Sequence, residues 1–143
     1  MRGVAMRLLG LVVLALWPCL VVAGPGGEFP CRVSRVTDGD TLRLTCGGQE
    51  RRVRLIGFDT PEVFHPKCAA ERAAGQRASA ALQALVGLGP ITRVRFHGRD
   101  RYGRDLAQVE IAGRDVAQTM LAAGVARSYD GRGKPDWCAI LPG

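Results

Sequence analysis

The sequence lacks the patterns that define several common classes of protein. It has only two histidines, His65 and His97, and no two cysteines are spaced as CxxC, so no zinc-binding pattern is complete. It has no internal repeat and no low-complexity tract between its terminal segments. Its apolar run from Leu8 to Val22 is shorter than the roughly 20 residues that a membrane-spanning helix needs. These absences exclude a zinc finger and argue against a membrane span.

The N-terminal segment has the organisation of a secretory signal. Arg2 and Arg7 give it a positive start, and the apolar run ends in small residues at Ala23. We therefore predict a signal peptide over residues 1–23, followed by a flexible Gly/Pro-rich leader over residues 24–30. The alternative is a retained anchor helix. Cleavage would leave 120 of the 143 residues, enough for one domain that is secreted or periplasmic.

The chain is basic, with 20 Lys and Arg against 13 Asp and Glu. Its formal net charge is +7, which falls to +5 when Arg2 and Arg7 are removed with the signal. A basic extracellular domain is attracted to polyanions, so nucleic acid, anionic lipid and acidic glycans are all candidate partners. Charge alone does not choose among them.

The cysteines after residue 23 predict disulfides. There are four, an even number behind a signal peptide, and four cysteines allow three pairings. Cys31 and Cys46 are equally distant from Asp38–Gly39, the centre of a predicted hairpin turn, and would face each other across its strands. This favours a Cys31–Cys46 bridge and leaves Cys68 with Cys138.

Hydrophobic periodicity predicts a mainly β protein of the α+β class. Runs of strands interrupted by one helix indicate a small barrel rather than a parallel sheet. A tail over residues 130–143, rich in Gly and Pro, is expected to form loops. The predicted strands cover about residues 31–36, 42–46, 52–57, 91–96 and 106–111, and the predicted helices cover residues 69–86 and 115–123.

Two acidic clusters fall at turns. Asp38 and Asp40 flank a glycine in a hairpin turn, and Asp59 and Glu62 lie just past the third predicted strand. If the second and third strands pair, the clusters converge at one edge of the barrel, where carboxylates suit a hard cation such as Ca²⁺. The simpler interpretation of Asp-Gly-Asp is a turn alone, and the EF-hand pattern is absent.

Two arginines also stand out. Arg54 lies on the alternating third strand among apolar neighbours, so it needs an anionic partner. Arg104 lies in a loop that also holds Arg101, and Asp100 or Asp105 would serve it as a structural partner. Considered singly, each residue fits a solvated charged surface as well as a site.

The order of these residues carries more information than any one of them. Asp-Gly-Asp-Thr at 38–41, Arg-Leu-Ile-Gly-Phe-Asp-Thr-Pro-Glu at 54–62 and Asp-Arg-Tyr-Gly-Arg at 100–104 follow one another along the chain. This pattern resembles the staphylococcal-nuclease-like (thermonuclease) family, over about residues 31–129. The resemblance implies a nuclease domain built as a five-stranded OB-type barrel with two packed helices. It also implies Ca²⁺-dependent hydrolysis of DNA and RNA to 3′-phosphorylated products. We expect single-stranded or frayed DNA and RNA as the preferred partners, and a monomeric state.

The resemblance also assigns a metal site. Matching the motifs residue by residue, Asp40 and Asp59 would bind Ca²⁺ together with the backbone carbonyl of Thr60. Asp38 would lie in the outer shell.

The same match assigns the catalytic groups. Glu62 would accept a proton from the attacking water, and Arg54 and Arg104 would stabilise the charge that develops on the phosphate. Arginine suits this role because its planar fork binds two phosphate oxygens at once. The expected substrate-binding residues are Tyr102, Arg101 and Tyr129, with Trp137 as a second candidate for contact with a base.

The sequence also departs from the family, and it leaves other functions open. Better-known members extend into a third helix, which Pro135 and Pro142 make us expect to be absent here. One alternative function is a non-catalytic OB-fold module that binds nucleic acid or protein, since this fold hosts unrelated functions. Another is a disulfide-stapled domain of the cell envelope or an inhibitor.

Overall fold

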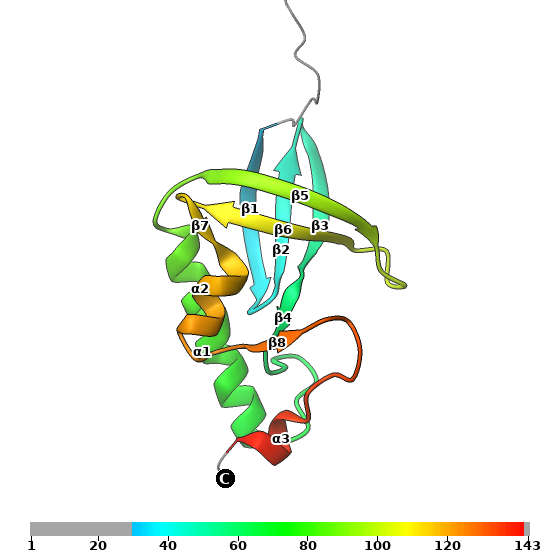
Figure 1. Cartoon of the computed structure of the whole chain (residues 1–143), viewed down its shortest axis with the longest axis vertical. Helices are drawn as coiled ribbons and strands as arrows, with labels where there is room; N and C mark the ends of the chain where they lie inside the picture. Colours follow the sequence, from blue (N-terminus) through cyan, green and yellow to red (C-terminus); the bar gives the residue numbers. More distant parts are fainter. Residues whose placement is uncertain (1–29, 142–143) are drawn as a thin grey trace, which may run out of the picture.

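The first strands form a meander of β1 (Cys31–Asp38), β2 (Thr41–Cys46) and β3 (Gln49–Leu55), as Figure 1 shows. This computed structural model describes residues 30–141. The predicted signal peptide lies outside the described residues, as does the predicted leader except for its last residue. In β2, alternate residues from Leu42 to Cys46 are buried, which is the period-two pattern from which this strand was predicted.

The sheet continues through two strands from the second half of the chain. Its order is β1-β2-β3-β6-β5, with β5 at Ile91–Arg99 and β6 at Asp105–Ile111. The mainly β, α+β class is confirmed, but β3 and β6 pair in parallel. The expected closed barrel is not confirmed, because no backbone ladder joins β1 to β5 within residues 30–141. Both edge strands carry register shifts, which bend a strand and interrupt its pairing.

Three short strands were not predicted. Strand β4 (Gly57–Asp59) pairs antiparallel with β8 (Arg127–Tyr129), and β7 (Arg114–Asp115) pairs with β6. Each has two or three residues, too few to show a periodic pattern. The β4–β8 pair lies between the main sheet and the C-terminal tail in Figure 1.

The β1–β2 hairpin reaches the predicted Cys31–Cys46 pairing by a different route. Its last pair is Asp38 with Thr41, so the turn is centred on Gly39–Asp40 rather than one residue earlier. Two register shifts along β1 then restore Cys31 opposite Cys46. Both predicted disulfides, Cys31–Cys46 and Cys68–Cys138, are formed.

Two helices match their predictions. Helix α1 (Ala69–Val86) has the predicted bounds, and α2 (Val116–Ala122) begins after Asp115, whose side chain caps it by accepting from the Gln118 amide at 2.8 Å. Helix α1 buries the residues predicted for its apolar face: Ala74, Ala78, Leu82 and Leu85. The core between α1, α2 and the sheet includes Leu42, Leu44, Val53, Leu55, Phe58 and Met120. No helix among residues 30–141 is long and apolar enough to cross a membrane.

The tail corrects one prediction. It contains a third helix, α3 (Trp137–Ile140), where only loops were expected. Asp136 caps this helix by accepting from the Ala139 amide at 3.3 Å. Pro135 precedes the cap, so its missing N–H interrupts no helical hydrogen bond. The helix has four residues, and the Cys68–Cys138 disulfide ties it to the start of α1.

Candidate active site

Arg54, near the end of β3, lies at the centre of the candidate site. The residue is 9% exposed, with one guanidinium nitrogen 2.9 Å from Asp40 Oδ2 and the other 3.0 Å from Asp59 Oδ1. The carbonyls of Leu55 and Phe58 accept further hydrogen bonds from it, at 2.9 and 3.3 Å. A buried arginine thus has two carboxylate partners, one from the turn at Gly39–Asp40 and one from the end of β4.

The two acidic clusters meet because the turn at Gly39 packs against the end of β4. Asp40 Oδ2 accepts hydrogen bonds from the Thr60 amide, at 3.3 Å, and from the Thr60 hydroxyl, at 3.1 Å. A Cβ on Gly39 would lie 2.8 Å from both the Thr60 hydroxyl and the Ala78 methyl. Only glycine therefore allows this approach without a shift of one of the two segments.

Asp59 is fully buried, and both of its oxygens have partners. Oδ1 pairs with Arg54, and Oδ2 accepts a hydrogen bond of 2.8 Å from the indole nitrogen of Trp137. Burial raises the pKa of the Asp59 carboxyl above its usual range, although the Trp137 bond and the nearby Lys134 charge oppose the shift. The carboxylate is held in one orientation by groups from β3 and α3.

Asp38 contacts this cluster through the backbone. Its Oδ1 accepts from the Asp40 amide at 3.1 Å. Burial, and then the neighbouring Asp40 charge, raise the pKa of Asp38 to about 6. Asp38 therefore contacts the cluster through its hydrogen bond with the Asp40 amide.

Arg104, just before β6, joins the cluster through a hydroxyl. One guanidinium nitrogen lies 3.4 Å from Thr41 Oγ1, which in turn donates to Asp40 Oδ1 at 3.0 Å. Its Nε donates to Asp100 at 2.8 Å, so the structural partner considered from the sequence is present. The Arg104 side chain is 22% exposed, which leaves part of it accessible to a ligand.

Glu62 lies on the more open side of the cluster. Its side chain is 40% exposed, and Oε1 lies 3.0 Å from Lys134 Nζ. Lys134 is also 3.8 Å from Asp59 Oδ1, so it bridges the two carboxylates. Partial burial lowers the pKa of Lys134, but the bond to Glu62 and the carboxylate charges outweigh it, and the net shift is upward.

The predicted substrate-binding residues lie at the edge of this cluster. Tyr102 is 61% exposed, and its ring lies beneath the guanidinium groups of Arg101, at 4.8 Å, and Arg104, at 5.6 Å. Tyr129 pairs with Gly57 in the β4–β8 ladder. Within residues 30–141 the Tyr129 side chain forms no hydrogen bond with the cluster. Tyr102, by contrast, contacts the cluster through the Arg104 guanidinium over its ring.

Sequence reasoning missed Lys134, Thr41 and the indole bond of Trp137. Trp137 is 5% exposed and bonded to Asp59, so its ring is not free to stack on a base. A lone lysine in a Gly/Pro-rich tail carries no signal of its own. Only the predicted Cys68–Cys138 bridge indicated that this tail comes near the site.

One further group of possible metal ligands lies outside this cluster. Among the described residues, the side chains of Cys68, Glu71 and Cys138 come within 4.8 Å of one another. Both sulfurs are joined in the disulfide, so no thiolate is left to bind a metal. This group therefore does not offer a thiolate metal site.

The Trp137–Asp59 hydrogen bond leads to a stability prediction. Trp137→Phe keeps an aromatic ring but removes the donor, which leaves Asp59 Oδ2 buried without a partner. We expect the free energy of unfolding in urea to fall by about 1–3 kcal/mol. Tyr129→Phe, which also removes one polar group from a ring, is the control. Equal losses in both variants would show that the indole bond contributes nothing specific.

Comparison with known proteins identifies the domain. Residues 52–137 match the model of a family described as "Staphylococcal nuclease homologue". The matched segment holds Arg54, Asp59, Glu62, Arg104 and Lys134 and ends at Trp137.

Several curated proteins are also similar to the chain. It is 37% identical over 97 residues to the SPbeta prophage-derived endonuclease YokF of Bacillus subtilis (strain 168), covering 66% of this chain and 32% of that protein. It is 36% identical over 97 residues to Endonuclease YncB of the same organism, covering 66% and 46%. An uncharacterized endonuclease of Escherichia coli O157:H7 is 35% identical over 115 residues, covering 80% and 67%. The chain thus spans less than half of the two Bacillus relatives.

Proposed function

Because this chain belongs to the staphylococcal nuclease homologue family, we propose that it is a calcium-dependent nuclease that hydrolyses phosphodiester bonds of DNA and RNA. The observation that carries the proposal is the cluster around Arg54, in which carboxylates from a turn and from a strand end converge with two arginines and an accessible glutamate. The endonuclease names of the relatives support the same activity.

The donor set suits calcium. Asp38, Asp40, Asp59 and Glu62 supply four carboxylates to one region. Among residues 30–141 only Arg54 and Lys134 form ion pairs with them, so a net negative charge is left for a dication. All of these donors are oxygens, as calcium prefers. We propose that Asp40, Asp59 and the Thr60 carbonyl hold the ion and that Asp38 supports them from the outer shell. Bound calcium would supply charge neutralisation at the phosphate.

The chain's own residues would supply the remaining chemistry. Glu62 accepts a proton from the attacking water, because it is the most exposed carboxylate of the cluster and is not needed as a metal ligand. Arg54 and Arg104 stabilise the negative charge that grows on the phosphate oxygens. Both guanidiniums are held by carboxylates, Arg54 by Asp40 and Asp59 and Arg104 by Asp100, so their position is set before the substrate binds. Cleavage leaves a 3′-phosphorylated product.

Substrate contacts are proposed for the exposed loop beside Arg104. Tyr102 presents an exposed ring and hydroxyl. Arg101 is also exposed and adds a cation, and its guanidinium donates to the Tyr102 hydroxyl at 2.7 Å.

 Tyr102 and Arg101 therefore form one exposed pair that can contact a phosphate next to the scissile one. Tyr129, on the strand beside β4, is proposed to contact the substrate at the opposite edge of the site.

Metal dependence tests the proposal directly. Single-stranded DNA, plasmid and RNA should be cleaved in the presence of Ca²⁺ and left intact in the presence of a chelator. Asp40→Asn should raise the calcium concentration needed for half-maximal activity, because it removes a charged ligand. Glu50→Gln, which changes a carboxylate paired with Arg43 on the sheet, is the matched control. Equal cleavage with and without chelator would exclude a calcium-dependent mechanism, and no cleavage in either condition would favour a non-catalytic binding module.

We also propose a secreted or periplasmic location and a monomeric state. The two disulfides support an oxidising compartment, where such bridges form and persist.

A further inference from the structure

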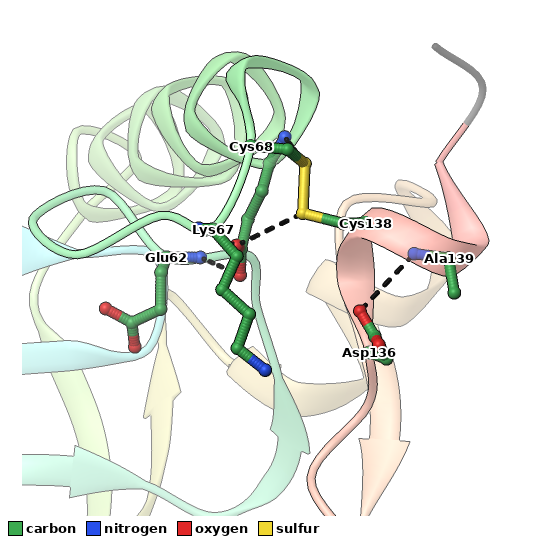
Figure 2. Close-up of a disulfide and its surroundings, with 7 residues drawn as sticks. Glu62, Lys67, Cys68, Asp136, Cys138 and Ala139 are labelled. Carbon is green, nitrogen blue, oxygen red and sulfur yellow. Dashed lines mark hydrogen bonds between the residues drawn. A yellow bond between two sulfur atoms is a disulfide. The ribbon is translucent and has the colours of Figure 1, made fainter.

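A buried carboxylate lies directly beneath the segment that carries Glu62. Glu71, in the first turn of α1, is 4% exposed, and its two oxygens point at the backbone of the preceding loop. Oε1 accepts a hydrogen bond from the Glu62 amide at 3.3 Å, and Oε2 accepts one from the Lys67 amide at 2.7 Å. One side chain therefore fixes both ends of the loop from Glu62 to Lys67. Figure 2 labels these two residues, close to the Cys68–Cys138 disulfide.

The position of Glu71 in its helix favours this arrangement. It is the third residue of α1, where an acidic side chain is stabilised by the positive end of the helix dipole. In a capping box an acid at this position bonds the backbone of the cap residue, here Cys68. Glu71 instead reaches one residue further, to Lys67, and then on to Glu62. Its carboxylate thus serves the loop as well as the helix end.

A second contact fixes the same loop from the next turn of the helix. A Cβ on Gly75 would lie 2.7 Å from the Pro61 carbonyl oxygen and 2.9 Å from that of Glu62. Only a glycine lets α1 come this close to the backbone of Glu62. The disulfide closes the arrangement on the other side, where Cys138 Sγ lies 3.7 Å from Glu71 Oε2.

From these contacts we infer that Glu71 is a positioning residue for Glu62, which holds the backbone of the proposed general base at a fixed place relative to Arg54 and Asp59. The inference rests on the proposed function, since it needs Glu62 to act on the substrate. Glu71 itself is buried and touches no reacting atom.

The test combines Glu71→Gln with Glu62→Gln. Glutamine keeps the size of Glu71, but its NH₂ group must face one of two amide donors, so the loop shifts. We expect kcat on single-stranded DNA in saturating Ca²⁺ to fall by about 10–100-fold with little change in KM, because a misplaced group costs rate more than binding. In the Glu62→Gln background the same substitution should change kcat by less than about threefold, since residues that act as a unit are not additive.

Gly75→Ala displaces the same loop without changing any charge. It should lower kcat in the same direction and should also lose its effect in the Glu62→Gln background. Gly87→Ala, at the far end of α1, where the nearest atom to a Cβ is 3.3 Å away, is the matched control and should keep full activity. If Glu71→Gln does not fold, the Gly75→Ala result decides.

The outcomes separate the two ideas. If Glu62→Gln is slowed as expected but the Glu71→Gln and Gly75→Ala losses multiply with it, the positioning role is wrong and the proposed function stands. Full kcat in both Glu71→Gln and Gly75→Ala would likewise overturn the positioning role. If Glu62→Gln keeps full activity, the base assignment fails, and the positioning role fails with it.

Discussion

Glu62→Gln is expected to slow cleavage by about 10²–10⁴-fold, the range over which a general base contributes to catalysis. The thermal midpoint should change by only a few degrees, because the Glu62–Lys134 pair is 40% and 48% exposed and such pairs contribute about 0–1 kcal/mol. Cleavage of single-stranded DNA in Ca²⁺ and a thermal melt of the same preparation measure both quantities.

Arg104→Ala should show the same separation of activity from stability. Its loss removes a stabilising charge from the phosphate, which typically costs about 10²–10³ in rate. Arg93 and Glu110 form a matched ion pair on the sheet, 3.1 Å apart, and Arg93→Ala and Glu110→Gln serve as controls. A collapse of the fold in Glu62→Gln or Arg104→Ala, with the controls intact, would point to a structural role instead.

Removing the Cys68–Cys138 bridge is expected to have the largest effect on stability. This bridge spans a sequence separation of 70, and a loop of that length gives about 4 kcal/mol in the chain-entropy treatment. The Cys31–Cys46 bridge spans 15 residues and should contribute about 3 kcal/mol. Urea titrations of the two double-alanine variants measure both losses.

The two bridges should differ more clearly in their effect on activity. Cys138 belongs to α3, which carries the Trp137 donor to Asp59, whereas Cys31 and Cys46 lie at the open end of a hairpin. Under conditions where each variant remains folded, loss of Cys68–Cys138 should therefore lower kcat, and loss of Cys31–Cys46 should leave it nearly unchanged. Equal activity in the two variants would show that the tail does not support the site.

Much of the fold could be predicted from local patterns. The apolar spacing of Ala74, Ala78, Leu82 and Leu85 is regular, and both ends of α1 were correct. The convergence of Asp40 and Asp59 was predicted from the pairing of β2 with β3, and the structure contains this pairing. The roles of these residues stay a prediction until activity is measured.

Other features depended on contacts that no local pattern records. Helix α3 is four residues long, and its position depends on a disulfide and on the Trp137–Asp59 bond between residues 78 positions apart. The positions of strands β7 and β8 are determined by the strands with which they pair rather than by their own sequences. The barrel was predicted from the order of strands and helices and then from the resemblance, and the register shifts in β1 and β5 could not be predicted from alternation alone.

The parallel pairing of β3 with β6 has a consequence for how the molecule forms. Val53 pairs with Asp105 across a segment of chain that contains both α1 and β5. The entropy lost in closing such a long loop opposes formation of the β3–β6 ladder until its hydrogen bonds are made, so pairings of this kind form slowly. Arg54 lies in that ladder, paired with Leu106, and Arg104 directly precedes it, so the two arginines come together only when the ladder forms. While the chain is still being synthesised, Arg54 is therefore present before the charged residues of the site can be brought together.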